Sequence, residues 1–276
     1  MSFIPEVWSK EIEARLDKVL VASAITNNTW EKDIAKVGDT VNVFISGQIT
    51  VTDYDPDTGL GTVQRPTNTT GQLVVNIAKA FNFRVDSIDA AQQSLDELGK
   101  YSKDAATGVK EVFDAYILSR YVEAGLSVNG GTKIEVTASN VEDLFGEAWE
   151  VLSDADVPLS DRWAVVPPKI ARIINKVLGG KDTSLGDQAI QQGFVNRFQG
   201  FDIYMSTQVA VTNDGTNDLW QVMFGHRSAI AKAYKVLEIQ AYKPEKFFGD
   251  AVKGLIVYGA KVFTPNKLAV LQAIKA

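Results

Sequence analysis

The segment from Val85 to Ala124 decides the fold, and it reads VDSIDAAQQSLDELGKYSKDAATGVKEVFDAYILSRYVEA. Its apolar residues recur at spacings of three and four, which predicts one helix with a single buried stripe. They are Ile88, Ala91, Leu95, Leu98, Tyr101, Val109, Val112, Phe113, Tyr116, Ile117 and Tyr121. Gly125 suits the end of this helix, and Thr107-Gly108 is its predicted weak point, because both residues are poor helix formers. Such a helix spans about 60 Å, so we expect an elongated or flat subunit rather than a sphere.

Composition excludes several classes of protein. The chain has 276 residues, of which 45% are hydrophobic and 22% charged, with no cysteine and one histidine. Disulfides and thiolate metal sites are therefore excluded, and no apolar run approaches the length of a membrane span. We expect no cofactor, no metal and no membrane partner.

The charge is unevenly distributed along the chain. Residues 1–150 carry 13 basic and 23 acidic side chains, whereas residues 151–276 carry 15 and 11. An acidic portion and a mildly basic portion suit head-to-tail self-association, although solvated surfaces produce the same tally. The balance argues against a dedicated nucleic-acid binder, which concentrates basic residues on one face.

Two elements are predicted before the long helix. Pro5 begins a short amphipathic helix with an apolar stripe that includes Trp8, Ile12 and Leu16. After Gly38, two alternating segments predict the strands of a long hairpin. The first contains Val41, Val43, Ile45 and Val51, and the second contains Leu73, Val75 and Ile77 and continues to Val85. The polar segment between them, which includes Asp53, Asp55, Asp57 and Arg65, predicts a projecting loop.

After Gly125 the pattern mixes helices and strands without a regular βαβ rhythm, which favours an α+β fold. Ser139 and Glu142 have the spacing of a capping box, and they predict a helix that runs to about Leu152. Residues 163–166 predict a buried strand, and Pro167-Pro168 precedes a helix over 169–178. Strands are expected near 201–205, 220–224, 234–242, 254–264 and 268–273.

No motif predicts catalysis. His226 has no neighbouring partner for general base chemistry, so a structural role is expected. The segment Asp53-Tyr-Asp55-Pro-Asp57 resembles the start of a calcium loop, but Thr58 and Gln64 stand where that loop requires Gly and Glu. It is better interpreted as a solvated loop tip.

Several motifs resemble the major capsid proteins of tailed bacteriophages. They are Arg162-Trp-Ala-Val-Val-Pro-Pro168, Gly193-Phe-Val-Asn-Arg-Phe-Gln-Gly-Phe-Asp-Ile-Tyr-Met-Ser206, Phe224-Gly-His226 with Ala229-Ile230, and Asp250-Ala-Val-Lys-Gly-Leu-Ile-Val-Tyr-Gly-Ala-Lys-Val262 followed by Pro265. Their order is similar to that family over nearly the whole chain. The resemblance implies a Hong Kong 97-type fold with an N-terminal arm (1–37), an extended loop (38–84), a peripheral domain (85–129 and 233–276) and an axial domain (130–232).

The same resemblance implies an icosahedral shell of pentamers and hexamers in the virion, assembled in the host cytoplasm around non-specifically held double-stranded DNA. A portal is an expected partner. Some relatives cross-link through a Lys on the extended loop, but residues 37–78 contain none. Others begin with a cleaved scaffolding segment, whereas here the arm helix is predicted within a few residues of Met1, so a separate scaffolding protein is expected.

Exposed apolar residues on the hairpin and arm predict an assembly interface, because a neighbouring subunit is their natural cover. The predicted interface residues are Val41, Val43, Ile45, Val51, Asp53, Asp55, Asp57, Arg65, Leu73, Val75, Ile77, Trp8, Ile12 and Leu16. Three alternatives stay open: an encapsulin-like compartment with the same fold, an enzyme whose site is assembled from distant residues, and a tail-tube or adhesin-type structural protein.

Overall fold

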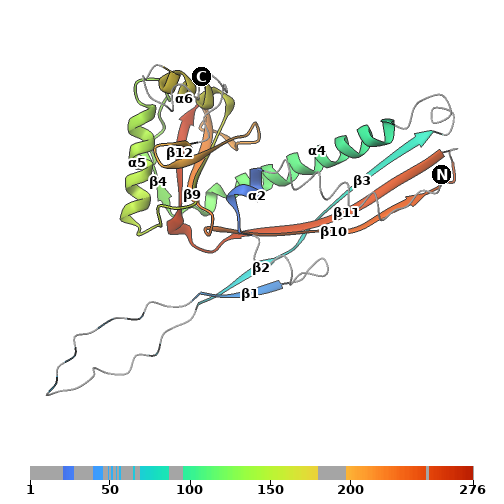
Figure 1. Cartoon of the computed structure of the whole chain (residues 1–276), viewed down its shortest axis with the longest axis horizontal. Helices are drawn as coiled ribbons and strands as arrows, with labels where there is room; N and C mark the ends of the chain where they lie inside the picture. Colours follow the sequence, from blue (N-terminus) through green and yellow to red (C-terminus); the bar gives the residue numbers. More distant parts are fainter. Residues whose placement is uncertain are drawn as a thin grey trace.

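A computed structural model describes residues 21–27, 40–45, 49, 51, 54, 56, 65, 69–86, 96–179, 197–246 and 249–275. Two units are visible in Figure 1. We refer to the long twisted three-stranded sheet and the helix along it as the peripheral unit, and to the more compact unit at one end of this sheet as the axial unit. The elongated outline agrees with the expectation from the long helix.

The peripheral sheet is antiparallel with strand order β10-β11-β3. Its strands are β10 (Ile230–Tyr242), β11 (Gly249–Val262) and β3 (Ile77–Asp86). Helix α4 (Asp96–Leu118) runs along one face of the sheet (Figure 1). Residues on alternate positions of β11 point to that face, where Tyr258 packs edge-on against Phe113 with ring centroids 5.2 Å apart.

The long helix is confirmed in its C-terminal part and differs at its ends. Val85 lies in β3 rather than in a helix, and residues 87–95 lie outside the described residues. Helix α4 continues through Thr107 and Gly108, so the predicted weak point does not interrupt it, and a 3-10 turn, η2 (Ser119–Glu123), follows. The end of this segment is tied to the sheet, because the Val262 N–H donates to Glu123 Oε2 at 3.0 Å.

Gly108 offers a direct test of helix propensity. A Cβ atom at this position would meet no atom within 4 Å, and the residue is exposed. We therefore expect Gly108→Ala to raise the free energy of unfolding by about 0.5–1 kcal/mol, measured by urea denaturation of the unassembled subunit. The matched control is Gly259→Ala, whose Cβ would lie 2.3 Å from the Val74 carbonyl oxygen and should destabilise. A loss of stability in Gly108→Ala would contradict this account of the helix.

The axial unit is built on a seven-stranded mixed sheet with order β4-β12-β9-β5-β7-β6, and β8 pairs with β9. The strands are β4 (Leu126–Ser127), β5 (Arg162–Val166), β6 (Arg197–Phe198), β7 (Phe201–Met205), β8 (Val211–Asn213), β9 (Asp218–His226) and β12 (Leu268–Ile274). The remaining elements are the helices α5 (Val141–Asp154) and α6 (Pro168–Gly179) and the 3-10 turns η3 (Asn129–Gly131) and η4 (Pro265–Lys267).

The axial core lies between the sheet and the two helices. Phe145 of α5 meets Phe198, Phe201 and Phe224 in edge-to-face contacts with centroids 4.9–6.3 Å apart. Four residues of α6 join the same core, namely Ile170, Ala171, Ile174 and Leu178. The predicted capping box is wrong: the residue before α5 is Asn140, and its side-chain oxygen accepts from the Thr137 N–H outside the helix.

Two elements lie across the predicted domain boundaries. Strand β12 joins the axial sheet, although the family resemblance implies a peripheral position for residues 233–276. Strand β3 joins the peripheral sheet, although the same resemblance implies an extended loop over residues 38–84. The cause is strand pairing: β12 pairs with β9, and β3 pairs with β11, over long separations in sequence.

Candidate assembly surfaces

The hairpin is shorter than predicted, and its base is packed on its own subunit. Among the described strands, β1 (Thr40–Ile45) pairs with β2 (Thr69–Val74) alone, with Ile45 opposite Thr69 and Thr40 opposite Val74. Leu73 and Val75 are fully buried against Ala233 and Val257 of the peripheral sheet. These two predicted interface residues are therefore covered within the subunit, and Ile77 packs on the core around α4.

Gly259 explains how the hairpin base fits this close to the sheet. A Cβ atom on Gly259 would lie 2.3 Å from the Val74 carbonyl oxygen and 3.1 Å from the Val75 Cα atom. Both are backbone atoms, which cannot rotate away as a side-chain end can. The glycine therefore lets the chain of β2 cross β11 in direct contact. The crossing lies on the sheet face opposite α4, because Val257 and Tyr258 point to opposite faces.

The described residues beyond the hairpin strands are open to solvent. Val51 is 93% exposed, Ile49 is 67% exposed and Tyr54 is 66% exposed, and Arg65 is exposed as well. The backbones of Val41, Val43 and Ile45 lie in β1, whereas nothing is described of their side chains. Asp53, Asp55 and Asp57 lie outside the described residues, as do Trp8, Ile12 and Leu16. Val51 is thus a predicted interface residue whose apolar side chain is exposed in the subunit, and Ile49 and Tyr54 add to this exposed apolar surface.

Residues 21–27, which lie within the predicted N-terminal arm, are anchored to the peripheral unit. Helix α2 (Val21–Ile25) lies against α4, and Ala22 and Ile25 are buried in the core there. Asn27 forms a parallel bridge to Ala231 of β10: its N–H donates to the Ile230 carbonyl, and its own carbonyl accepts from the Lys232 N–H. Residues 21–27 are therefore held in a fixed position beside α4.

Asp114 and Lys232 hold this anchor, and sequence reasoning missed both. The Ala22 N–H donates to Asp114 Oδ1 at 3.0 Å, which caps the start of α2 from α4. Lys232 is 1% exposed; its Nζ donates to Ser23 Oγ at 2.7 Å and lies 5.1 Å from the Tyr234 ring centroid. Each charged residue stands inside an apolar pattern, and that is the sequence signal that could have revealed them.

Burial raises the pKa of the Asp114 carboxyl above its ordinary value of 3.8. The backbone hydrogen bonds and the positive charges of Lys110 and Lys232 act in the opposite direction but have the smaller effect. A carboxyl with a raised folded-state pKa binds its proton more tightly in the folded protein. Its contribution to stability is therefore fully present below pH 3.8 and is lost as pH rises through the raised value.

We accordingly expect Asp114→Asn, which keeps an acceptor oxygen, to gain stability relative to the wild type as pH rises. The measurement is the urea midpoint of both proteins at about pH 4, close to the ordinary pKa of the carboxyl, and at about pH 7. Asp114→Ala is the control, because it loses the cap and should cost about 1–2 kcal/mol at both pH values. If the stability of the wild type and that of Asp114→Asn changed equally between the two pH values, the raised pKa of Asp114 would be refuted.

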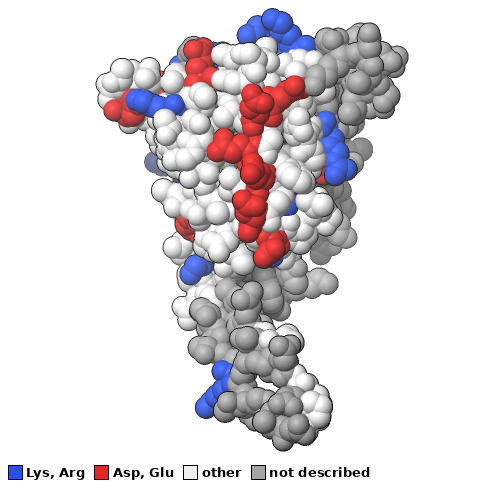
Figure 2. Space-filling view, turned by 90° about the vertical axis from the view of Figure 1, so that its left-hand side faces the viewer, with Lys and Arg blue, Asp and Glu red and all other residues white. Residues whose placement is uncertain are grey.

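Helix α5 presents an acidic ridge to solvent, formed by Asp143, Glu147, Glu150 and Asp154. Their spacings of four, three and four residues place them on one face, opposite the buried Leu144, Ala148 and Leu152. Figure 2 shows acidic side chains in a continuous column on this side of the axial unit. Glu147 Oε1 accepts from the Asn129 N–H at 2.7 Å, so this residue also has a structural role.

Helix α6 presents the opposite charge. Its basic stripe consists of Lys169, Arg172 and Lys176, and the helix contains no acidic residue. The stripe lies opposite the buried Ile170, Ile174 and Leu178. Arg172 and Lys176 are exposed, and neither forms an ion pair with any other described residue.

The single histidine of the chain is held by a neighbouring hydroxyl group. His226 is half-buried, and its Nδ1 lies 2.8 Å from Ser228 Oγ; burial and the charge of Lys267 lower its pKa. No cluster of three potential metal ligands occurs in the part of the chain that the structure describes. Likewise, none of the described helices is long and apolar enough to cross a membrane.

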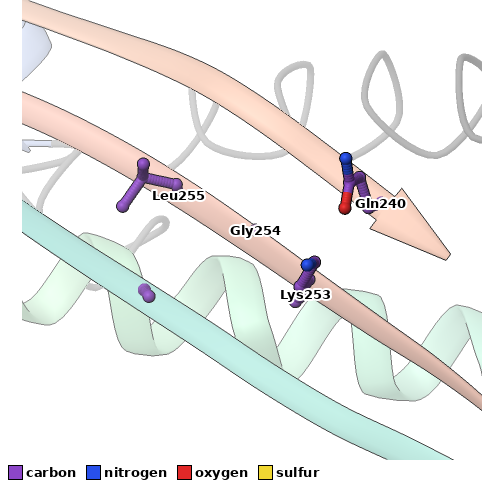
Figure 3. Close-up of a pocket in the computed structure, with 5 residues that line it drawn as sticks. Gln240, Lys253, Gly254 and Leu255 are labelled. Carbon is purple, nitrogen blue, oxygen red and sulfur yellow. The ribbon is translucent and has the colours of Figure 1, made fainter. Parts of the chain in front are cut away.

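One open hollow of about 230 Å³ lies on the peripheral sheet, lined by Ala80, Gln240, Lys253, Gly254 and Leu255. Figure 3 shows the Gln240, Lys253 and Leu255 side chains on strands of this sheet, with α4 passing behind. Lys253 Nζ lies 5.4 Å from the Tyr242 ring centroid. One cation and one amide on a small apolar surface do not form a reaction centre.

Solved structures share this architecture across their length. A chain from Mycobacterium phage Che8 aligns with a TM-score of 0.72 and 25% identity, covering 91% of this chain and 90% of that chain. The capsid of cyanophage P-SCSP1u aligns at 0.68 and 17% identity, with coverage of 92% and 87%. A virus-like particle from Pyrococcus furiosus aligns at 0.59 and 12% identity, with coverage of 96% and 98%. No protein-family model matches the chain, and no curated protein matches it.

The shared architecture is a mixed helix-and-sheet fold, which is also the fold of the cyanophage capsid and of the virus-like particle. It is the Hong Kong 97-type fold, which this chain shares with the capsids of tailed phages. The α+β expectation and the family resemblance seen in the sequence are both confirmed.

Proposed function

We propose that this chain is the major capsid protein of a tailed phage and that it self-assembles into the icosahedral shell of the virion. The observation that carries the proposal is the likeness to the Che8 chain over about nine-tenths of both chains. The role is structural rather than enzymatic, which fits an elongated subunit with an anchored arm and an exposed distal loop.

The finer features of assembly belong to the same proposal. Pentamers and hexamers form the shell, a separate scaffolding protein guides its assembly in the host cytoplasm, and a portal occupies one opening. The double-stranded DNA inside is held without sequence recognition. The net charge of −6 supports this last feature, since a container for any sequence needs no concentrated basic face.

An encapsulin-like compartment is the second candidate, favoured by the likeness to the Pyrococcus furiosus virus-like particle. It is less supported, because the TM-score and identity of that alignment are lower than those of the Che8 and P-SCSP1u chains. The two candidates share the shell and differ in its contents, which are DNA in one and cargo protein in the other.

Sedimentation of the purified protein, expressed with and without its neighbouring phage genes, tests the proposal. We expect particles far larger than the 30.1 kDa subunit, without a co-purifying cargo protein. Particles that carry a stoichiometric cargo protein would favour the encapsulin candidate. A protein that stays a small discrete species under every condition would contradict both.

A further inference from the structure

We propose that the acidic ridge of α5 docks on the basic stripe of α6 of a neighbouring copy of this chain, so that the pair forms a contact within each ring. This inference rests on the proposed shell function and assigns one of its subunit contacts. We assign a second copy of this chain as the partner of the acidic ridge, because the chain itself carries an exposed helix face of the opposite charge.

The charge pattern of α5 is unfavourable for an isolated subunit. The helix has five acidic residues and no basic one. Like charges at spacings of three and four repel each other along the ridge, and Asp154 sits near the negative end of the helix dipole. Within the described residues, Asp143, Glu150 and Asp154 form no ion pair that would relieve this repulsion. A positive surface supplied from outside the subunit would relieve it.

The basic stripe of α6 has the matching chemistry. Glu150 and Asp154 are four residues apart on α5, and Arg172 and Lys176 are four residues apart on α6. Each pair spans about 6 Å along its helix, so the two pairs can meet in register. Arg172 can also bind a carboxylate with two parallel hydrogen bonds, which fixes the geometry of a contact.

The placement of the two helices excludes pairing within one subunit and suits a ring. Helix α5 runs along one side of the axial unit, whereas α6 lies across its end (Figure 1). Both helices bury their apolar faces in the same core, so their charged faces point outward in different directions. Two different, complementary patches on one subunit make a head-to-tail contact, and repetition of such a contact closes a ring when the rotation permits.

The first test variant reverses the ridge by Glu150→Lys with Asp154→Lys. Both residues are exposed, and lysine near the C-terminal end of a helix is favoured by the dipole, so the subunit should fold at least as stably as the wild type. We expect the yield of shells or rings to fall by about tenfold or more, because like charges would then face each other. Circular dichroism and urea denaturation verify that the subunit is folded.

The second variant reverses the stripe by Arg172→Glu with Lys176→Glu, and the third combines all four substitutions in one chain. We expect the second to assemble as poorly as the first, and the combined variant to recover most of the wild-type yield, because its charges are again complementary. Raising salt to about 1 M should partly restore either single reversal, since the screening length then falls to about 3 Å.

Electron microscopy and sedimentation of the four proteins decide between the outcomes. Normal assembly of the folded ridge variant would overturn the proposed contact while leaving the shell function intact. Equally poor assembly of the combined variant would also overturn it, because the two faces would then contact different partners. Failure of the wild type itself to assemble under any condition would instead contradict the proposed function.

Discussion

Replacing residues 46–68 by a two-residue Asn-Gly turn is expected to leave a folded, soluble subunit that no longer forms shells. The turn would join Ile45 to Thr69, which are already opposite each other in the β1–β2 pair. The core of the hairpin base should survive, because Leu73 and Val75 pack on Ala233 and Val257 rather than on the removed residues. The free energy of unfolding should therefore change by no more than about 1 kcal/mol.

The loss of assembly is expected because the removed segment carries exposed apolar side chains, including Val51 and Tyr54. Light scattering measures assembly, and circular dichroism measures folding. A second variant keeps the loop length and changes Ile49, Val51 and Tyr54 to Ser. It tests whether assembly needs these side chains themselves or only a loop of full length. Normal shells from the shortened protein would refute the role of the distal loop as an interface.

Arg162→Met is expected to lower the free energy of unfolding by about 3 kcal/mol or more. The guanidinium is 1% exposed and donates to the carbonyl oxygens of Trp149, Val157 and Pro158 and to Ser153 Oγ. Burial lowers its pKa, yet the surrounding acceptors hold the charge in place. Its removal takes this donor away from the buried Val157 carbonyl, the Pro158 carbonyl and Ser153 Oγ near the end of α5.

Urea denaturation of the unassembled subunit measures this loss. Arg197→Met is the matched control, because Arg197 is exposed and its ion pair with Asp202 is 4.0 Å long, so the change should cost less than about 0.5 kcal/mol. The loss of stability in Arg162→Lys should lie between the losses in Arg162→Met and Arg197→Met, since a single ammonium group cannot reach all four acceptors. Equal stability of Arg162→Met and the wild type would contradict the structural role of this buried charge.

The sequence predicted elements that depend on local periodicity. The stripe that includes Phe113, Tyr116 and Ile117 predicted α4, and the apolar run in residues 163–166 predicted β5. These features could be found because one buried face imposes its period on the residues nearby. The fold class followed from the order of such elements.

Pairing between distant strands could not be predicted in the same way. Alternation continues without a break from Leu73 through Ile77 to Phe81, yet β2 pairs with β1 and β3 pairs with β11. The period of two is identical on both sides of Val75, so no local signal marks the change of partner. The predicted hairpin was too long for this reason, and two of its predicted interface residues are buried.

The partners of two buried charged residues could not be predicted from the sequence either. Asp114 follows Phe113 in the buried stripe, and Lys232 stands between Ala231 and Ala233. A charged residue inside an apolar pattern is a signal, because it must find a partner when it is buried. The partners of these two residues come from the arm, around 92 and 209 positions away in sequence. Because these separations are so long, the local sequence pattern could not predict the contacts that anchor residues 21–27.

Electron microscopy of the purified protein, alone and co-expressed with the genes that neighbour its own, tests the central claim most directly. We predict closed icosahedral shells, or rings of subunits that are competent to form them, with the axial units around each ring centre. Small discrete particles in every preparation, at concentrations where the subunit is folded by circular dichroism, would contradict the claim that this chain builds a shell.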